Sequence, residues 1–444
     1  MHPLIIYSDV FLRNLTTGMK KITGYRRSAI TMFIIVAGIF LLTQCVDKQE
    51  NETTPTGDNQ NIAKRAANVP VTRDQFAGSE TCIKCHRDIY NKHILTAHYL
   101  TTRPAEEKYI KGSFATGKNV YVYDTSMKVV MEKRDSGFYQ VGYYNGVEKI
   151  VRRFDIVVGS GSKGQTYIFK IGSNLFQLPV SYFTAAKEWA NSPQFPVKPV
   201  LFNRAITSRC LECHSTFVEK TSAVNVDPEA FNTGQMIFGV DCEKCHGPAA
   251  KHVAFQTQNP KETTAKYIIN PAKFTRQQSL DLCALCHGGR LHKTTPSFQF
   301  IAGDTLSNFF TMDNAPLDPT DIDVHGNQLG LLRASKCFRM SGTMTCLTCH
   351  DTHENERGKI SLFSQRCMQC HNTQHGTFCK MGDSLGNAIN NNCIDCHMPA
   401  KLSKSITELL PGHTTPTAAL IRSHYISIYP DETKKFREKM KGIK

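Results

Sequence analysis

Residues 346–353 read Cys-Leu-Thr-Cys-His-Asp-Thr-His, and the first five of them form a Cys-x-x-Cys-His motif that occurs seven times in the chain. With 17 cysteines and 17 histidines placed at random in 444 residues, about 0.02 copies of this heme-attachment spacing would be expected. Two thiols three positions apart reach the two vinyl groups on one porphyrin edge, and the adjacent histidine binds the iron. The sequence therefore predicts seven covalently attached hemes c, held by Cys82, Cys85, His86; Cys210, Cys213, His214; Cys242, Cys245, His246; Cys283, Cys286, His287; Cys346, Cys349, His350; Cys367, Cys370, His371; and Cys393, Cys396, His397.

This motif count excludes a disulfide scaffold and argues against an array of zinc fingers. Zinc binds Cys-x-x-Cys pairs well, but a zinc site has no need of a histidine directly after every pair. The apolar content is a modest 40% and there is one tryptophan. Since a chain of this length normally needs more apolar side chain for its core, seven porphyrins would supply the missing apolar surface.

The formal charge of +15 raises the question of nucleic-acid binding. About +4 of it lies in the first 44 residues, a segment that we expect to be removed. Each ferric heme with two ionised propionates adds about −1, so seven hemes leave the mature protein at about +4. The basic residues are therefore interpreted as partners of the propionates, and no nucleic-acid partner is predicted.

The N-terminus has the pattern of an export signal. Two basic pairs precede the apolar run 29–42, and Cys45 follows the run. Residues 1–44 are interpreted as a signal peptide whose true start is Met19, and Leu41–Cys45 resembles a bacterial lipoprotein box. Gln44 departs from the small residue usual before that cysteine, so an uncleaved N-terminal anchor helix stays open as the alternative. Both readings predict a membrane-anchored protein in the periplasm or at the cell surface of a bacterium.

The rest of the chain divides by composition. Residues 45–78 are predicted to be a flexible tether, 79–112 a first heme segment with a helix over 87–100, 113–200 an antiparallel β insert, and 201–444 a six-heme domain. The insert is indicated by β-rich runs at 120–123, 129–133, 138–144, 147–158, 166–171 and 175–180, separated by turn residues. The glycine-rich stretch 159–164 lacks the features of a phosphate loop and is predicted to be a hairpin loop.

Each iron still needs a sixth ligand. Apart from the motif histidines and His2, the candidates are His93, His98, His252, His292, His325, His353, His375, His413 and His424. A second imidazole is a common sixth ligand of a c-type heme. Three methionines near motifs, Met340, Met344 and Met398, are weaker candidates. His353 follows His350 by three residues, so it cannot bind the opposite face of the same heme and is predicted to bind the iron of another.

Several stretches resemble the multiheme c-type cytochromes, in the branch that includes hydroxylamine oxidoreductase and the tetraheme cytochrome that accepts its electrons. They are Cys346–His353, Cys242–His252, Asp323–Asn327 and Cys393–Pro399. The resemblance implies an α+β fold in which short helices and loops pack around the hemes. It also implies distal iron ligation by His98, His252, His325, His353 and His424. His375 and His413 complete the set on spacing alone, and His93 and His292 are predicted not to be ligands.

The leading functional hypothesis is electron transfer in a respiratory pathway, with other cytochromes or membrane quinol-linked complexes as redox partners. The alternative is a multiheme oxidoreductase that acts on a small nitrogen or sulfur compound at one open iron. The sequence therefore leaves open whether the protein is an enzyme. The chain has no Cys-x-x-Cys-Lys motif, the pattern of the nitrite reductases of this group. A structural subunit that docks through the β insert is a third possibility. The two remaining cysteines, Cys337 and Cys379, are predicted to form a disulfide, with a free thiol or iron ligation as alternatives.

Overall fold

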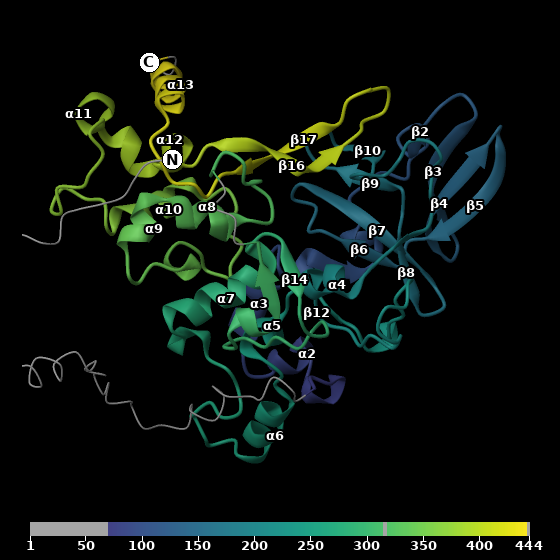
Figure 1. Cartoon of the computed structure of the whole chain (residues 1–444), viewed down its shortest axis with the longest axis horizontal. Helices are drawn as coiled ribbons and strands as arrows, with labels where there is room; N and C mark the ends of the chain where they lie inside the picture. Colours follow the sequence, from purple (N-terminus) through teal and green to yellow (C-terminus); the bar gives the residue numbers. More distant parts are fainter. Residues whose placement is uncertain (1–69, 314–317, 442–444) are drawn as a thin grey trace, which may run out of the picture. The chain divides into compact units, whose positions relative to one another are not determined.

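The computed structural model describes residues 70–313 and 318–441 (Figure 1). The described residues belong to one compact unit. The predicted signal peptide and Cys45 lie outside the described residues, as does the predicted tether up to residue 69. Val71 and Phe76 are buried in a core cluster, so the tether prediction for 45–78 extends too far. Within the described residues, no helix combines the length and the apolar character needed to cross a membrane.

A four-stranded antiparallel sheet forms the first half of the β structure, with its strands in the order β2-β3-β4-β5 (Figure 1). Its strands are β2 (Val120–Val122), β3 (Met127–Arg134), β4 (Gly137–Tyr144) and β5 (Val147–Arg153). Asn145 and Gly146 join β4 to β5, and both have positive φ, as a two-residue hairpin turn requires. Val129, Met131 and Val141 point into one core and are fully buried.

A second, seven-stranded sheet packs beside the first. The path β1-β6-β7-β8-β11 is extended by β9, which pairs with β7, and by β10, which pairs with β9. Tyr167, Phe154 and Trp189 fill the shared core, where the Phe154 and Tyr167 rings stack at 4.4 Å. The strands are β1 (Thr102–Pro104), β6 (Ile156–Val158), β7 (Gly164–Ile171), β8 (Asn174–Gln177), β9 (Val180–Phe183), β10 (Glu188–Asn191) and β11 (Arg204–Ala205).

We call strands β1–β11, residues 102–205, the β-insert. Antiparallel strands occur in each of the β-rich runs predicted from the sequence, but the run 147–158 is divided between β5 and β6, which belong to different sheets. Residues 159–163 link β6 to β7, so the predicted hairpin loop is one residue shorter than 159–164. The insert is wider than the predicted 113–200, because β1 pairs with β6 and β11 pairs with β8. The predicted helix over 87–100 is wrong in length, since α3 ends at His93 and a 3-10 turn begins only at Tyr99.

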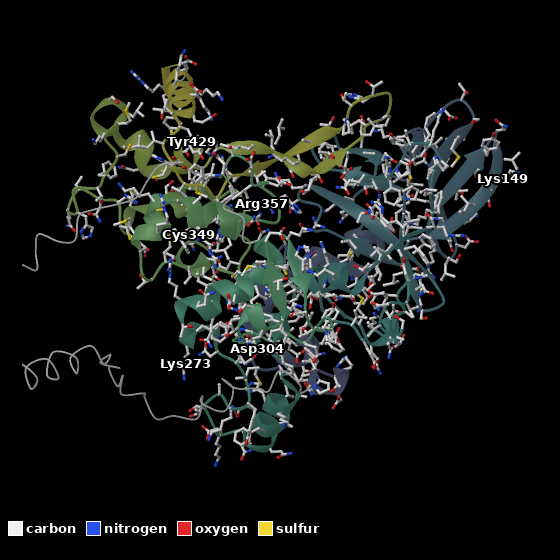
Figure 2. The ribbon with its side chains drawn as sticks, viewed as in Figure 1. Lys149, Lys273, Asp304, Cys349, Arg357 and Tyr429 are labelled. Carbon is white, nitrogen blue, oxygen red and sulfur yellow. The ribbon has the colours of Figure 1, made fainter. Side chains whose placement is uncertain are left out.

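The motif-bearing part of the chain consists of short helices joined by loops, as predicted. Figure 2 shows Cys349 among these helices and Lys149 on strand β5 of the β-insert. The helices are α2 (Ser79–Cys82), α3 (Arg87–His93), α4 (Ser208–His214), α5 (Cys242–His246), α6 (Ala250–Gln258), α7 (Arg276–His287), α8 (Gln328–Ala334), α9 (Lys336–Met340), α10 (Ile360–Met368), α11 (Gly382–Leu385), α12 (Ile394–His397) and α13 (Pro430–Lys441). Two-stranded ladders join β12 (Ser215–Phe217) to β13 (Ile237–Phe238) and β14 (Leu291–Lys293) to β15 (Phe310–Met312).

An additional hairpin near the C-terminus was not predicted. Strands β16 (Ala400–Glu408) and β17 (Thr417–Arg422) pair antiparallel, and an irregularity separates Leu402 from Thr407. The hairpin begins just after the seventh motif, and an isolated bridge joins Leu409 to Asn191 of β10. It therefore connects the heme-motif region to the β-insert.

Candidate heme-binding sites

The motifs adopt one turn of helix each, which is what heme attachment needs. In the motif at 346–350 the amide of His350 donates to the carbonyl of Cys346 at 3.0 Å, and the same bond links His397 to Cys393 at 3.1 Å. A single helical turn brings residues i and i+3 or i+4 to one side of the backbone. Both thiols and the imidazole of a motif therefore project toward the same region of space.

Thiols of different motifs lie against one another. Four pairs of thiols from different motifs lie close enough to interact, namely Cys82–Cys242, Cys213–Cys286, Cys283–Cys346 and Cys367–Cys393. The neighbouring Cys286 thiol lowers the pKa of Cys213 to about 7, and the neighbouring Cys367 thiol lowers the pKa of Cys393 to about 6. Weaker electrostatic interactions link Cys245 with Cys283 and Cys349 with Cys370. Together these interactions connect all seven motifs into one network.

Five motif histidines use Nδ1 for a hydrogen bond to a protein group, and among the hydrogen bonds of the described residues none of the five uses Nε2. A metal-bound histidine characteristically donates its other ring N–H to a carbonyl or side-chain oxygen, which fixes the tautomer and the ring orientation. The pairs and Nδ1 distances are His214 with Thr101 Oγ1 (3.0 Å), His246 with Ile269 O (2.9 Å), His287 with Gln328 Oε1 (3.0 Å), His371 with Thr377 O (3.3 Å) and His397 with Ser427 O (2.8 Å).

Three predicted distal histidines face motif histidines at a spacing that suits an iron between them. A metal–imidazole bond of about 2 Å places the centres of two rings on opposite sides of one metal about 6 Å apart. The ring centres of His98 and His287 are 6.2 Å apart, and those of His350 and His424 are also 6.2 Å apart. Those of His246 and His353 are 6.1 Å apart. The side chains thus fit three bis-histidine heme sites.

A fourth pairing is indicated by electrostatics. Burial and then the neighbouring His325 lower the pKa of His214 to about 4. The Nδ1 atom of His325 lies 3.2 Å from Ser405 Oγ, which again leaves Nε2 free. Burial is also the main reason why the pKa of His98 and of His424 falls to about 4. These imidazoles are therefore neutral near pH 7, the state in which a histidine binds a metal.

The two histidines predicted not to be ligands use Nε2 for contacts within the protein. His93 Nε2 lies 3.2 Å from the carbonyl oxygen of Val240, and His292 Nε2 lies 3.1 Å from Asp313 Oδ1. The His93 ring lies 6.4 Å from that of His353. Because its Nε2 faces a carbonyl, His93 does not compete with His246 for the position opposite His353.

The remaining predicted ligands are less well placed. Nδ1 of His252 on α6 donates to the backbone carbonyl oxygen of Lys266 at 2.8 Å. His375 lies in the exposed loop that folds back on His371, where its amide donates to Asn372. His413 is exposed at the turn between β16 and β17. Among the ring contacts of the described residues, none brings these three histidines against a motif histidine, so their ligand roles stay predictions.

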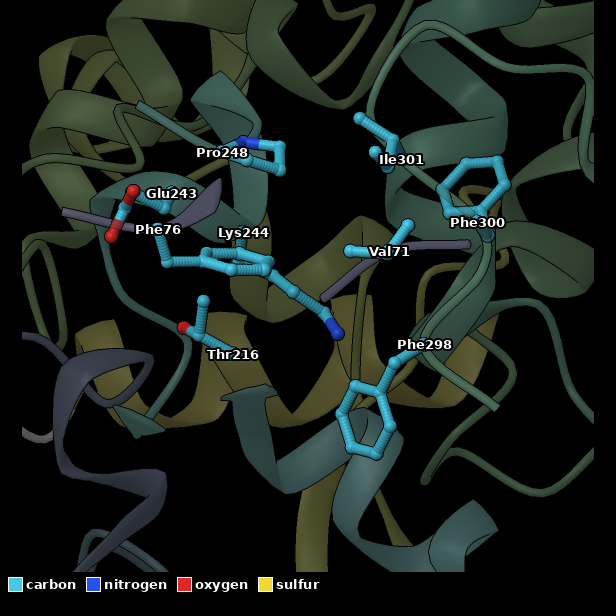
Figure 3. Close-up of a pocket in the computed structure, with 9 residues that line it drawn as sticks. All are labelled: Val71, Phe76, Thr216, Glu243, Lys244, Pro248, Phe298, Phe300 and Ile301. Carbon is cyan, nitrogen blue, oxygen red and sulfur yellow. The ribbon is translucent and has the colours of Figure 1, made fainter. Parts of the chain in front are cut away.

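Carboxylates inside the motifs tie neighbouring segments together. Glu243 is buried, and its carboxylate accepts the amides of Ala77, Gly78 and Ala249, each at 2.8 Å. Figure 3 shows Glu243 and Lys244 at a small pocket, with the Lys244 amine directed toward the Phe298 ring, 5.2 Å from its centre. Glu243 thereby anchors the segment before the first motif to the third motif.

Cys337 and Cys379 do not form the predicted disulfide. Both are free thiols in the structure. The thiol of Cys337 is close enough to that of Cys370 to interact with it electrostatically, and the thiol of Cys379 is close enough to that of Cys396. The disulfide prediction is therefore not supported, and each cysteine neighbours a different motif.

Comparisons with known proteins agree with the motif geometry. A model of the family described as cytochrome c554 and c-prime matches residues 183–247, which contain the second and third motifs. The crystal structure of the outer cell wall cytochrome OcwA has a similar fold, with a TM-score of 0.51, 17% sequence identity and coverage of 81% of each chain. No curated protein shows significant sequence similarity to the chain.

Proposed function

We propose that this chain is a multiheme c-type cytochrome that binds seven hemes c covalently and transfers electrons between redox partner proteins, a proposal supported by the family match over residues 183–247 and by the fold similarity to OcwA. When bound, each heme supplies one-electron redox chemistry at its iron. The cysteine pairs of the seven motifs would hold the porphyrin edges, and each motif histidine would supply one iron ligand.

The thiol network is the observation that carries this proposal. Since each motif thiol bonds a porphyrin edge, thiols in contact bring two such edges together. The pairs Cys82–Cys242 and Cys367–Cys393 place the first and seventh motifs at opposite ends of the network. The fourth motif is a junction, because Cys286 contacts Cys213 while Cys283 contacts Cys346. We therefore propose a branched electron path whose three ends are the first, second and seventh motifs.

Paired imidazoles are proposed as iron ligands at four of the sites, namely His98 with His287, His325 with His214, His353 with His246, and His424 with His350. An iron held by two imidazoles in this way would have no position for a substrate. The Nδ1 contacts, such as His397 with Ser427, hold each ring in one orientation and make the imidazole a stronger donor. Such sites suit electron transfer better than substrate chemistry.

A second function is favoured by one observation. His413 lies exposed at the turn of the β16–β17 hairpin, beside the β-insert. If this histidine binds no iron, six of the predicted distal histidines serve seven irons. An oxidoreductase that acts on a small nitrogen or sulfur compound at one open iron is therefore the alternative proposal.

We also propose an exported location, with lipid on Cys45 as the membrane anchor. The basic residues and the apolar run before Cys45 support this, together with covalent heme attachment, which takes place after export. OcwA is described as an outer cell wall cytochrome, and that description agrees with a site outside the cytoplasm. The proposed partners are other cytochromes or membrane quinol-linked complexes.

The mass of the mature chain tests the cofactor and the anchor together. We expect an intact-mass spectrum with seven heme additions and an N-terminus at Cys45 that carries acyl chains, because all fourteen motif thiols are needed for attachment. Fewer than seven hemes would contradict the cofactor proposal. A mass that retains residues 19–44 without lipid would contradict the lipid anchor and support an anchor helix.

A further inference from the structure

Glu408, the last residue of β16, is an acidic side chain in an apolar environment. It is 3% exposed, and its Oε2 atom has no hydrogen-bond partner. A Cβ atom added to Gly164 would lie 2.9 Å from Glu408 Oε1 and 2.9 Å from the carbonyl oxygen of Tyr182. Gly164 therefore provides the space into which this carboxyl group fits.

The residues around Glu408 attach the hairpin to the β-insert. The amide of Asn191 donates to the carbonyl of Leu409 at 2.9 Å. Phe183 and Ala190 of the insert pack with Ala419 of the hairpin in a small apolar cluster. Glu408 thus lies at the interface between the hairpin and the insert.

Other residues of the hairpin, and the segment that follows it, contact proposed iron ligands. Ser405 donates its backbone amide to Asp323 at 3.0 Å, and its Oγ lies 3.2 Å from His325 Nδ1. His424 lies two residues after β17, and the carbonyl of Ser427 contacts Nδ1 of His397. The hairpin therefore links the site of Glu408 to three of the proposed heme sites.

We propose that a proton on Glu408 holds the β16–β17 hairpin on the β-insert, and that loss of this proton loosens the segment that positions His325 and His424. A charged carboxylate without partners is strongly disfavoured in an apolar site. The titratable group that interacts with Glu408 from the packed strands is the phenol of Tyr167 on β7. A phenol is not a cation, so it does not compensate a negative charge on Glu408.

The direction of the pH effect follows from this burial. Burial raises the pKa of Glu408 to about 8 in the docked state, whereas an undocked glutamate has a pKa of about 4.3. A group with a raised pKa contributes its full stabilisation below the undocked value and loses it as the pH rises through the docked value. The hairpin should therefore loosen between about pH 5 and pH 8 and change little above that range.

Hydrogen exchange of residues 400–422 tests the proposal in the full-length holoprotein. After correction for intrinsic exchange rates, we expect protection of the wild-type hairpin to fall at least tenfold from pH 5 to pH 8. In Glu408→Gln, which has the same shape and no charge, protection should stay constant. Glu188→Gln, at an exposed acidic residue of β10, is the matched control and should follow the wild type.

Constant protection in the wild type, or the same fall in Glu408→Gln, would overturn the proposal. If the glutamine variant does not fold, the wild-type series decides alone. The effect on the hemes rests on the proposed ligand roles of His325 and His424. Reduction potentials should follow pH over the same range in the wild type and not in Glu408→Gln. If the hydrogen exchange of the hairpin depends on pH but the reduction potentials do not, the proposed coupling to the hemes is wrong. The hydrogen-exchange result itself does not depend on which histidines bind iron.

Discussion

Replacement of His353 by alanine is expected to convert one low-spin heme to a high-spin heme while all seven hemes stay attached. The ring centre of His353 lies 6.1 Å from that of His246, the spacing of two imidazoles across one iron. His353 comes from the segment that follows the fifth motif, whereas His246 belongs to the third. This histidine therefore ties two motifs together, and its loss should open an iron without affecting any thioether bond.

Electron paramagnetic resonance of the oxidised variant measures this change. One low-spin signal should be replaced by a high-spin ferric signal, and redox titration should show a shifted potential for one heme. His292→Ala is the matched control, because Nε2 of His292 contacts Asp313 on the surface. An unchanged number of low-spin hemes in His353→Ala would show that this histidine is not a ligand.

The second large effect is expected at Glu243, which supports the first motif from within the third. Alanine at this position would leave the buried amide of Ala249 and the partly buried amides of Ala77 and Gly78 without acceptors. Each unsatisfied amide costs about 1–3 kcal/mol, so the free energy of unfolding should fall by about 3–5 kcal/mol. Denaturation followed by circular dichroism measures the loss.

Two further variants distinguish the stability lost with the Glu243 carboxylate from the stability lost through any substitution in this region. Glu243→Gln keeps one oxygen acceptor and should lose less stability than Glu243→Ala. Glu80→Ala removes an exposed acid from the neighbouring helix α2 and should change the free energy of unfolding by less than about 0.5 kcal/mol. Equal stabilities of Glu243→Ala and Glu80→Ala would show that the carboxylate does not anchor the first motif.

The strands of the β-insert were predictable because their signals are local. Runs of β-branched and aromatic residues end at Asn145-Gly146, where the backbone conformation requires such residues. The edges of the insert were missed, since Thr102–Pro104 is a strand only through its pairing with Ile156–Val158. The β16–β17 hairpin was missed for a similar reason, because its interface with the insert joins residues more than 200 positions apart.

The candidate heme sites show the same division between local and distant information. The seven motifs are contiguous, so heme attachment by their cysteines and iron binding by their histidines can be predicted from the sequence alone. The partner of each distal histidine depends on the fold: His98 faces His287, and His353 faces His246. The acceptors of the Nδ1 atoms, such as the carbonyl of Ile269, carry no sequence signal because any residue supplies a backbone oxygen.

The central claim is that this chain is an electron-transfer protein whose irons are closed by paired histidines. Quantitative electron paramagnetic resonance of the fully oxidised wild-type protein, normalised to its heme content, tests this claim most directly. If two histidines bind each iron, the low-spin ferric signals should account for all the hemes. A high-spin ferric signal equivalent to one heme per chain would contradict this account and identify an open iron at which a substrate can react.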